Sequence, residues 1–199
     1  MMTMIESGET YTDVKFKNDI FSAQTIKAST FVECHFERCK FVESAFERCA
    51  FEDCIFSNCD LSLAKFPATS MIRVRFEDSK LIGINWTLSK WMAKSVSKRA
   101  DFVRCNIQYS AFMGLPMRGV QMTACAAHDV NFTDADLQEA NCAKSDFMNS
   151  RFAGANLSGA NFVGAINYRI DFQSTKIKKA KFSLPEALAL LDALEIEIL

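Results

Sequence analysis

The residues best suited to chemistry in this sequence are cysteines, and five of them lie close to a histidine. Residues 31 to 59 read FVECHFERCKFVESAFERCAFEDCIFSNC. Cysteine and histidine are the usual ligands of structural zinc, and paired cysteines also form disulfides. A zinc site needs four ligands that converge on one point, typically with C-x₂₋₄-C spacing. Here most cysteines are five or ten residues apart, which argues against a metal site.

The phenylalanines account for this spacing, because they recur at every fifth position. The series runs from Phe16 to Trp91, shifts by one residue, and resumes from Phe102 to Phe182; it contains all 18 phenylalanines. Neither an α-helix nor a straight strand can bury every fifth residue on one face. The chain must therefore turn a corner within each repeat, as a solenoid does. The predicted core includes Phe36, Phe46, Phe56, Phe132, Phe152 and Phe162.

A second series, two residues before each member of the first, consists mostly of small side chains. Seven of the eight cysteines fall on this series, and Cys142 falls on the first. Small residues suit inward positions between large neighbours, because protein interiors are close-packed. Cysteine then acts as a small buried hydrophobe. We therefore expect free thiols, no metal and no cofactor.

These patterns resemble a known family. The motif A-(D/N)-(L/F)-x-x, seen in ANLSGANFVGA at residues 155–165, is similar to the consensus of the pentapeptide-repeat proteins. The resemblance covers residues 14–182 and implies an all-β solenoid, a right-handed quadrilateral parallel β-helix with four pentapeptides in each coil. Residues 1–13 are then a flexible N-terminus. The phase shift at residues 92–101 predicts a loop, because an extra residue must bulge outward from the coil.

The end of the chain, FSLPEALALLDALEIEIL from Phe182, departs from the repeat. Ser183 and Glu186 form a capping box, which predicts a short α-helix, and residues 195–199 alternate like a terminal strand. We expect residues 183–199 to cap the solenoid and to form a two-fold homodimer. The expected interface residues are Leu184, Leu188, Leu191, Leu194, Ile196 and Ile198.

Composition narrows the class of function. The net charge of -1 does not suit direct binding of nucleic acid. The first residues do not resemble a secretory signal, and no apolar run is long enough for a membrane span. We therefore expect a cytoplasmic protein with reduced thiols. With two histidines, no glycine-rich phosphate loop and no Ser/His/Asp spacing, the sequence predicts a binding protein rather than an enzyme.

Within the family, the sequence is most similar to the topoisomerase-protecting subgroup, the Qnr quinolone-resistance and the albicidin- and microcin-immunity proteins. Residues 60–87 and the C-terminal tail carry this finer resemblance, and the albicidin-immunity type is closest. It implies a homodimeric rod that binds DNA gyrase and protects it from an antibiotic or toxin through a shape and charge like those of duplex DNA. The candidate contacts are Lys94, Ser95, Lys98 and Arg99 in the loop and the acidic Glu33, Glu43 and Asp53.

Two other classes of function remain open. A net charge of -1 is less acidic than a DNA mimic should be, which gives loop contacts more weight than mimicry. The main alternative is a structural or scaffolding repeat protein with an unrelated protein partner. A thiol- or metal-dependent sensor would use the cysteines, but their predicted burial argues against it.

Overall fold

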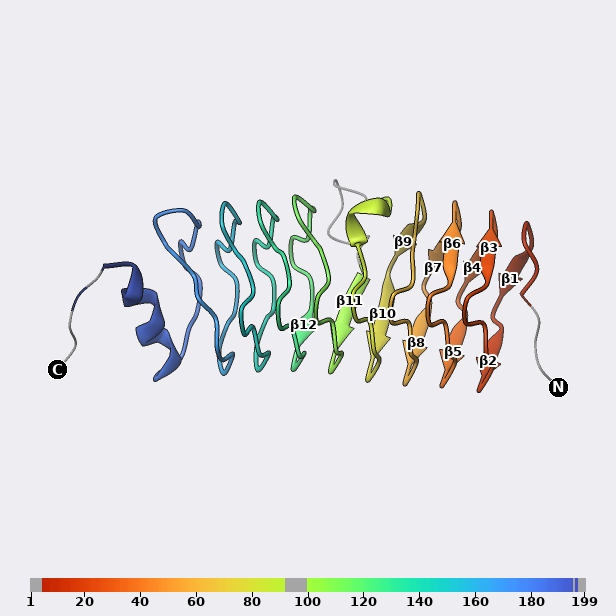
Figure 1. The fold of residues 1–199 in the computed structure, drawn as a ribbon, viewed down its shortest axis with the longest axis horizontal. Helices are drawn as coiled ribbons and strands as arrows, with labels where there is room; N and C mark the ends of the chain where they lie inside the picture. The colour runs from red at the N-terminus through yellow and green to blue at the C-terminus, as the bar shows by residue number, and fades with distance from the viewer. Residues whose placement is uncertain (1–4, 92–99, 195, 197–199) are drawn as a thin grey trace.

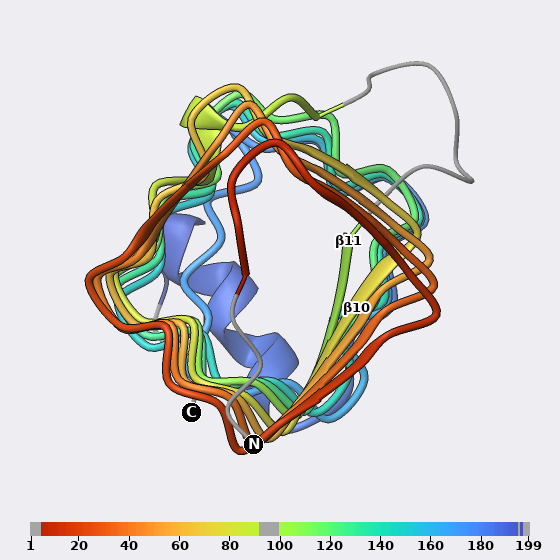
Figure 2. The same cartoon turned by 90° about the vertical axis from the view of Figure 1, so that its right-hand side faces the viewer.

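The chain forms a rod of stacked coils, described for residues 5–91, 100–194 and 196 of a computed structural model. Strand β1 lies at one end and helix η2 at the other (Figure 1). Viewed along its axis, the rod has four sides (Figure 2). Residues twenty positions apart pair in parallel, as Phe16, Phe36 and Phe56 do. The predicted parallel β-helix is confirmed.

The strands are short because the chain turns a corner after each of them. One sheet has the order β1-β4-β7-β9 and contains β1 (Thr10–Thr12), β4 (Thr30–Val32), β7 (Ala50–Glu52) and β9 (Ser70–Ile72). A second has the order β12-β11-β10-β8-β5-β2 and contains β2 (Lys15–Lys17), β5 (His35–Glu37), β8 (Ile55–Ser57), β10 (Val74–Glu77), β11 (Ala100–Val103) and β12 (Met122–Thr123). A third pairs β3 (Thr25–Lys27) with β6 (Ala45–Glu47). Isolated parallel bridges, such as Asn106 with Ala126, continue the stacking toward the C-terminus.

The core is a set of aromatic stacks along the axis of the rod. The rings of Phe36 and Phe56 lie 4.4 Å apart and are almost parallel, and Trp86 stacks between Phe66 and Phe112. The six phenylalanines expected in the core, Phe36, Phe46, Phe56, Phe132, Phe152 and Phe162, are all buried. Each buried phenylalanine contributes about 1.5–3 kcal/mol through the apolar surface that it removes from water.

The corners of the coils have a regular backbone. The second residue after each inward-facing phenylalanine usually has positive φ, for example 54° at Arg38 and 52° at Asp53. We call these positions corner residues, and those stacked in successive coils a corner column. The N–H of a corner residue donates to a carbonyl of the next coil, as that of Arg38 does to Ser57 at 2.9 Å.

The β-helix begins earlier than expected. Tyr11, in β1, pairs with Phe31 and stacks on its ring at 5.2 Å. The N–H of Gly8 donates to the carbonyl of Lys27. The prediction of a flexible N-terminus is therefore wrong for residues 5–13; residues 1–4 lie outside the described part. Tyr11 lies five residues before Phe16 and so continues the series of inward residues.

The phase shift corresponds to a longer insertion than one residue. Before it, Arg75 pairs with Ile55 at the usual offset of twenty; after it, Arg75 pairs with Asp101, an offset of 26. Six residues are therefore inserted into this coil. Residues 92–99, which include the candidate contacts Lys94, Ser95, Lys98 and Arg99, lie outside the described residues.

A second irregularity precedes the C-terminus. Asn167, which falls on the inward series, is exposed, while Tyr168 and Ile170 are buried and Phe172 is half-buried. An asparagine could not fill an apolar interior without leaving its amide unpaired. The neighbouring tyrosine ring fills the space instead and packs against Phe162 at 5.8 Å.

The C-terminal helix is of the 3-10 type rather than α. It is η2 (Glu186–Leu194), and Leu190 packs against the core. The hydroxyl of Ser183 accepts from the N–H of Gly164 at 2.9 Å, so it anchors the helix to the last coil. Ile196 is not in a strand, and residues 195 and 197–199, including Ile198, lie outside the described part. Of the predicted interface, Leu184, Leu188, Leu194 and Ile196 are exposed and Leu191 is half-buried.

The other helix is one 3-10 turn in the coil before the insertion, η1 (Trp86–Leu88). None of the helices in the described residues is both long and apolar enough to cross a membrane.

Candidate protein-binding surfaces

The cysteines lie inside the rod and not on a surface. All eight are buried free thiols. The seven on the series of small inward residues donate toward main-chain carbonyls; Cys54, for example, lies 3.4 Å from the oxygen of Phe31 and 3.3 Å from that of Glu52. Within the described residues, no three His, Cys, Asp or Glu side chains cluster in a way that could hold a metal ion.

The pKa values of these thiols are raised by burial and, for Cys34 and Cys39, lowered by hydrogen bonds. Desolvation raises the pKa of Cys105 to about 11 and that of Cys125 to about 12. Cys34 and Cys54 are stacked, and a hydrogen bond from Cys54 lowers the pKa of Cys34 to about 7 while it raises the pKa of Cys54. Desolvation alone raises the pKa of Cys34, but this hydrogen bond outweighs it. Its side chain is only 1% exposed, however, so reagents have little access to it.

The three acidic candidates do not form one side of the rod. Glu33 and Asp53 are twenty residues apart and share one corner column. Glu43 is ten residues, or half a coil, from each of them, so it lies at the opposite corner of the four-sided rod (Figure 2). The chain enters the insertion after Trp91, on the side of the rod formed by β1, β4, β7 and β9, because Lys90 pairs with Ser70 of β9. The column of Glu33 and Asp53 therefore adjoins the insertion, and Glu43 does not.

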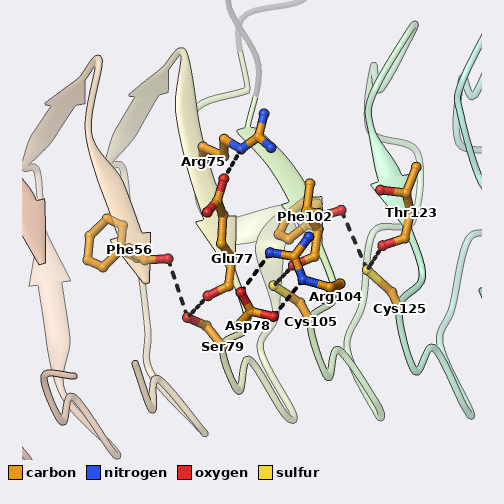
Figure 3. A network of polar contacts seen from close by, with 11 residues as sticks. Phe56, Arg75, Glu77, Asp78, Ser79, Phe102, Arg104, Cys105, Thr123 and Cys125 are labelled. Carbon is orange, nitrogen blue, oxygen red and sulfur yellow. Dashed lines mark hydrogen bonds and ion pairs between the residues drawn. The ribbon is translucent and has the colours of Figure 1, made fainter. Parts of the chain in front are cut away.

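Arginines neutralise much of the negative charge beside the insertion. Arg73 stacks above Asp53 and donates to both of its carboxylate oxygens, at 2.5 and 2.6 Å. Its guanidinium lowers the pKa of Asp53 and also lies 2.8 Å from Glu52. Arg104 forms the same two-pronged contact with Asp78, at 2.7 Å for both hydrogen bonds (Figure 3).

The network in Figure 3 ties together the coils on either side of the insertion. The hydroxyl of Ser79 donates to the carbonyls of Glu77 and Phe56, at 2.7 and 3.3 Å. The thiol of Cys125 lies 3.5 Å from the carbonyl of Phe102 in the preceding coil. Arg75 binds the carboxylate of Glu77. Of the contacts drawn, the pair of Arg104 and Asp78 joins residues that lie before and after the insertion.

Two glutamates nearer the N-terminus, Glu37 and Glu47, are also paired with cations. Glu37 accepts a hydrogen bond from Lys15 and lies near Lys17 and Arg38, and these cations lower its pKa to about 2. Glu47 lies 3.0 Å from Lys27. A surface that imitates DNA should present unpaired negative charge, so this pairing weakens the case for electrostatic mimicry.

Asp146 has partners from two other coils. The Nε2 atom of His128 lies 2.9 Å from its carboxylate, and the amide of Asn167 donates to it at 2.9 Å. Burial raises the pKa of Asp146, but these two contacts outweigh it and leave the pKa lowered. His128 itself is half-buried. Its carboxylate partner was not evident from the sequence, because it lies one coil away.

Sequence reasoning missed a group of exposed apolar side chains. Leu63 and Tyr109 are corner residues, and Leu88 ends η1; all three are exposed. The signal was present, since corner residues are otherwise small or polar.

Comparison with known proteins agrees with this architecture. Residues 29–112 and 97–162 match the family described as a pentapeptide repeat region. No curated protein matches the sequence. The structure of QnrB1, a plasmid-mediated fluoroquinolone resistance protein, is similar at 20% identity, with a TM-score of 0.54, over 96% of this chain and 92% of that one. HetL, a pentapeptide repeat protein involved in heterocyst differentiation in the cyanobacterium Nostoc sp. strain PCC 7120, has 14% identity and a TM-score of 0.39 over 85% of each chain.

Proposed function

Because the chain belongs to the pentapeptide-repeat family, we propose that it is a homodimeric rod that binds DNA gyrase and protects this topoisomerase from an antibiotic or toxin. The protein acts by binding and not as an enzyme. The part of the chain that the structure describes offers no cluster of metal-ligating side chains, and its cysteines are buried. Its outer surface is what a partner can contact.

The observation that carries the proposal is the C-terminal end of the rod. A repeat protein needs only a cap at its last coil, and Leu190 of η2 supplies one by packing against the core. The exposed Leu184, Leu188 and Leu194 are not needed for that cap. Exposed leucines at a chain end suit a two-fold interface with a second copy. Such a dimer is the form that the resemblance to the topoisomerase-protecting subgroup implies.

The contacts with gyrase in this proposal lie around the insertion. Lys94, Lys98 and Arg99 supply positive charge there, beside the column of Glu33 and Asp53. Because arginines bind much of the nearby carboxylate charge, the proposal relies on loop contacts more than on imitation of DNA.

A supercoiling assay tests the proposal. Purified gyrase is treated with a poison, such as a fluoroquinolone, and the protein is added at increasing ratio. We expect cleaved DNA to decrease and supercoiling to recover before a tenfold excess is reached. Neutralising Lys94, Lys98 and Arg99 together should weaken the protection, and less so in high salt, where surface charges are already screened. If the parent protein leaves poisoned gyrase unchanged with each poison class tried, the topoisomerase function is wrong and a scaffolding role with another partner takes its place.

A further inference from the structure

One corner column differs from the others in the nature of its side chains. Among the described non-glycine residues with positive φ, only Leu63 and Tyr109 have a large apolar or aromatic side chain. They lie in one column with Gly83 between them, since the N–H of Leu63 donates to Ile82 and that of Gly83 to Gln108. Leu63 is 49% exposed and Tyr109 64% exposed. Water therefore reaches an apolar strip at a corner that elsewhere holds small or polar residues.

A pocket of about 430 Å³ opens at this strip, in the coils just before the insertion. Its apolar lining comes from Leu63, Ala64, Gly83 and Leu88. Leu63 leans across the glycine, so that a Cβ atom at position 83 would lie 2.7 Å from its Cδ2 atom. Leu88, at the end of η1, forms the other wall and is 49% exposed. The volume lies within the range of about 300–1,000 Å³ that is usual for ligand pockets.

Two charged residues at this pocket lack the partners that similar residues have elsewhere. Asp53 and Asp78, at other corners, each bind an arginine of the next coil. In the column of Glu43, the residue of the next coil is Leu63 instead of an arginine. Neither Glu43 nor Lys65 forms an ion pair within the described residues. The pocket thus combines an apolar interior with one free carboxylate and one free ammonium group at its rim.

We infer that this pocket binds a bulky apolar side chain of a partner protein, from a segment with a basic group to meet Glu43 and an acidic group to meet Lys65. A buried apolar anchor surrounded by polar contacts is typical of the residues that dominate binding energy. The inference rests on the proposed function for the partner's identity, which is DNA gyrase. It places a contact at the corner opposite the column of Glu33 and Asp53, where Glu43, the third acidic candidate, lies.

Protection of an introduced thiol tests the location. The native cysteines are buried, so we expect a labelling reagent to react with them slowly, and the parent protein gives this background rate. Leu88→Cys adds one accessible thiol. With N-ethylmaleimide as the reagent, we expect saturating gyrase to slow the labelling of Leu88→Cys about tenfold or more. Met148→Cys is the control, because Met148 is 41% exposed and lies in a later coil. Equal labelling of Leu88→Cys with and without bound gyrase, or equal protection at both positions, would overturn the inference.

A second variant tests the energetic contribution of the pocket. Leu63→Asn removes the apolar wall with a residue that already occupies corner positions, at Asn18 and Asn58, so the fold should be retained. We expect it to weaken gyrase binding roughly tenfold, as the loss of an anchor contact does. Lys144→Asn makes a matched change at another corner and should leave affinity unchanged.

The binding measurements distinguish a failure of the pocket inference from a failure of the proposed function. If Leu63→Asn binds as tightly as a binding-competent parent, the pocket is not the contact and the proposed function stands. If the parent itself does not bind gyrase, the proposed function fails first, and the identity of the partner fails with it.

Discussion

Phe36 illustrates how one side chain supports several coils. Its ring stacks on Phe16 at 4.8 Å and on Phe56 at 4.4 Å. Phe36→Ala should lower the free energy of unfolding by about 3–5 kcal/mol, because hydrogen bonds between coils prevent the backbone from closing the cavity. Urea denaturation followed by circular dichroism measures the loss. His35→Ala, on the outward side of the same strand, should cost much less. If Phe36→Ala unfolds at the same urea concentration as the parent, the aromatic stack is not the core.

Glu37 should respond to acid through its three cationic neighbours. Its pKa is lowered to about 2, first by the hydrogen bond from Lys15. A carboxylate with a lowered pKa stabilises the fold above its ordinary pKa of 4.5, and this contribution is lost as the pH falls from there toward 2. In Lys15→Met, the pKa of Glu37 should rise toward 4.5, as measured by NMR titration of the carboxyl carbon. Lys65→Met, which removes a lysine with no described carboxylate partner, should leave it unchanged.

At the scale of single residues, the sequence predicted what faces inward better than what happens at the surface. Between Phe16 and Phe162, the described apolar residues on the five-residue series are buried, except for Trp91 beside the insertion. After Phe162, Asn167 is exposed and Tyr168 is inside instead, and the later members Phe172, Ile177 and Phe182 are only half-buried. Surface pairs such as Arg73 with Asp53 could not be recognised until the twenty-residue coil was established.

Among the elements, the insertion shows a limit of reasoning from periodicity. A shift in phase fixes the length of an insertion only to within a multiple of five, so one inserted residue and six give the same signal. The register of β10 against β11 shows that the number is six. The C-terminal helix shows another limit. Its leucine pattern suits an α-helix, whereas the structure has a 3-10 helix whose Leu190 packs against the core.

Removing six residues within 92–97 should restore the twenty-residue register without a change in the core. We expect the free energy of unfolding to stay within about 1 kcal/mol of the parent's, because every residue of the five-residue series, including Trp91 and Phe102, is kept. Its protection of poisoned gyrase should fall substantially. A length-matched replacement of the same residues by glycine and serine separates the role of sequence from that of length. Full protection by both variants would mean that the insertion is not a contact.

For the molecule as a whole, charge pairing and shape point to different conclusions. The rod is long and regular, as duplex DNA is, but several of its carboxylates bind arginine or lysine of a neighbouring coil. A net charge of -1 is consistent with that pairing. We therefore expect the proposed binding to gyrase to depend on specific contacts at the insertion and at the apolar corner pocket more than on a general negative field.

The proposed dimer is the expectation about the whole molecule that is most open to a direct test. Truncation at residue 182 is a poor experiment, since it also removes the packing of Leu190 on the core and the hydrogen bond between Ser183 and Gly164. Leu184→Glu combined with Leu188→Glu keeps both contacts, because these side chains are exposed and Leu184 is 76% accessible. In a two-fold dimer, the new carboxylates of one subunit would lie close to those of the other. Both the cost of burying these charges and the repulsion between them oppose association.

We expect the double variant to sediment as a folded monomer at concentrations where the parent is a dimer. Ile20→Glu is the control, since it adds a carboxylate to an exposed apolar position near the opposite end of the rod and should not affect association. Circular dichroism checks that both variants keep the β-helix. A double variant that remains a dimer would place the interface elsewhere on the rod, and a parent that sediments as a monomer would show that the exposed leucines bind a different partner.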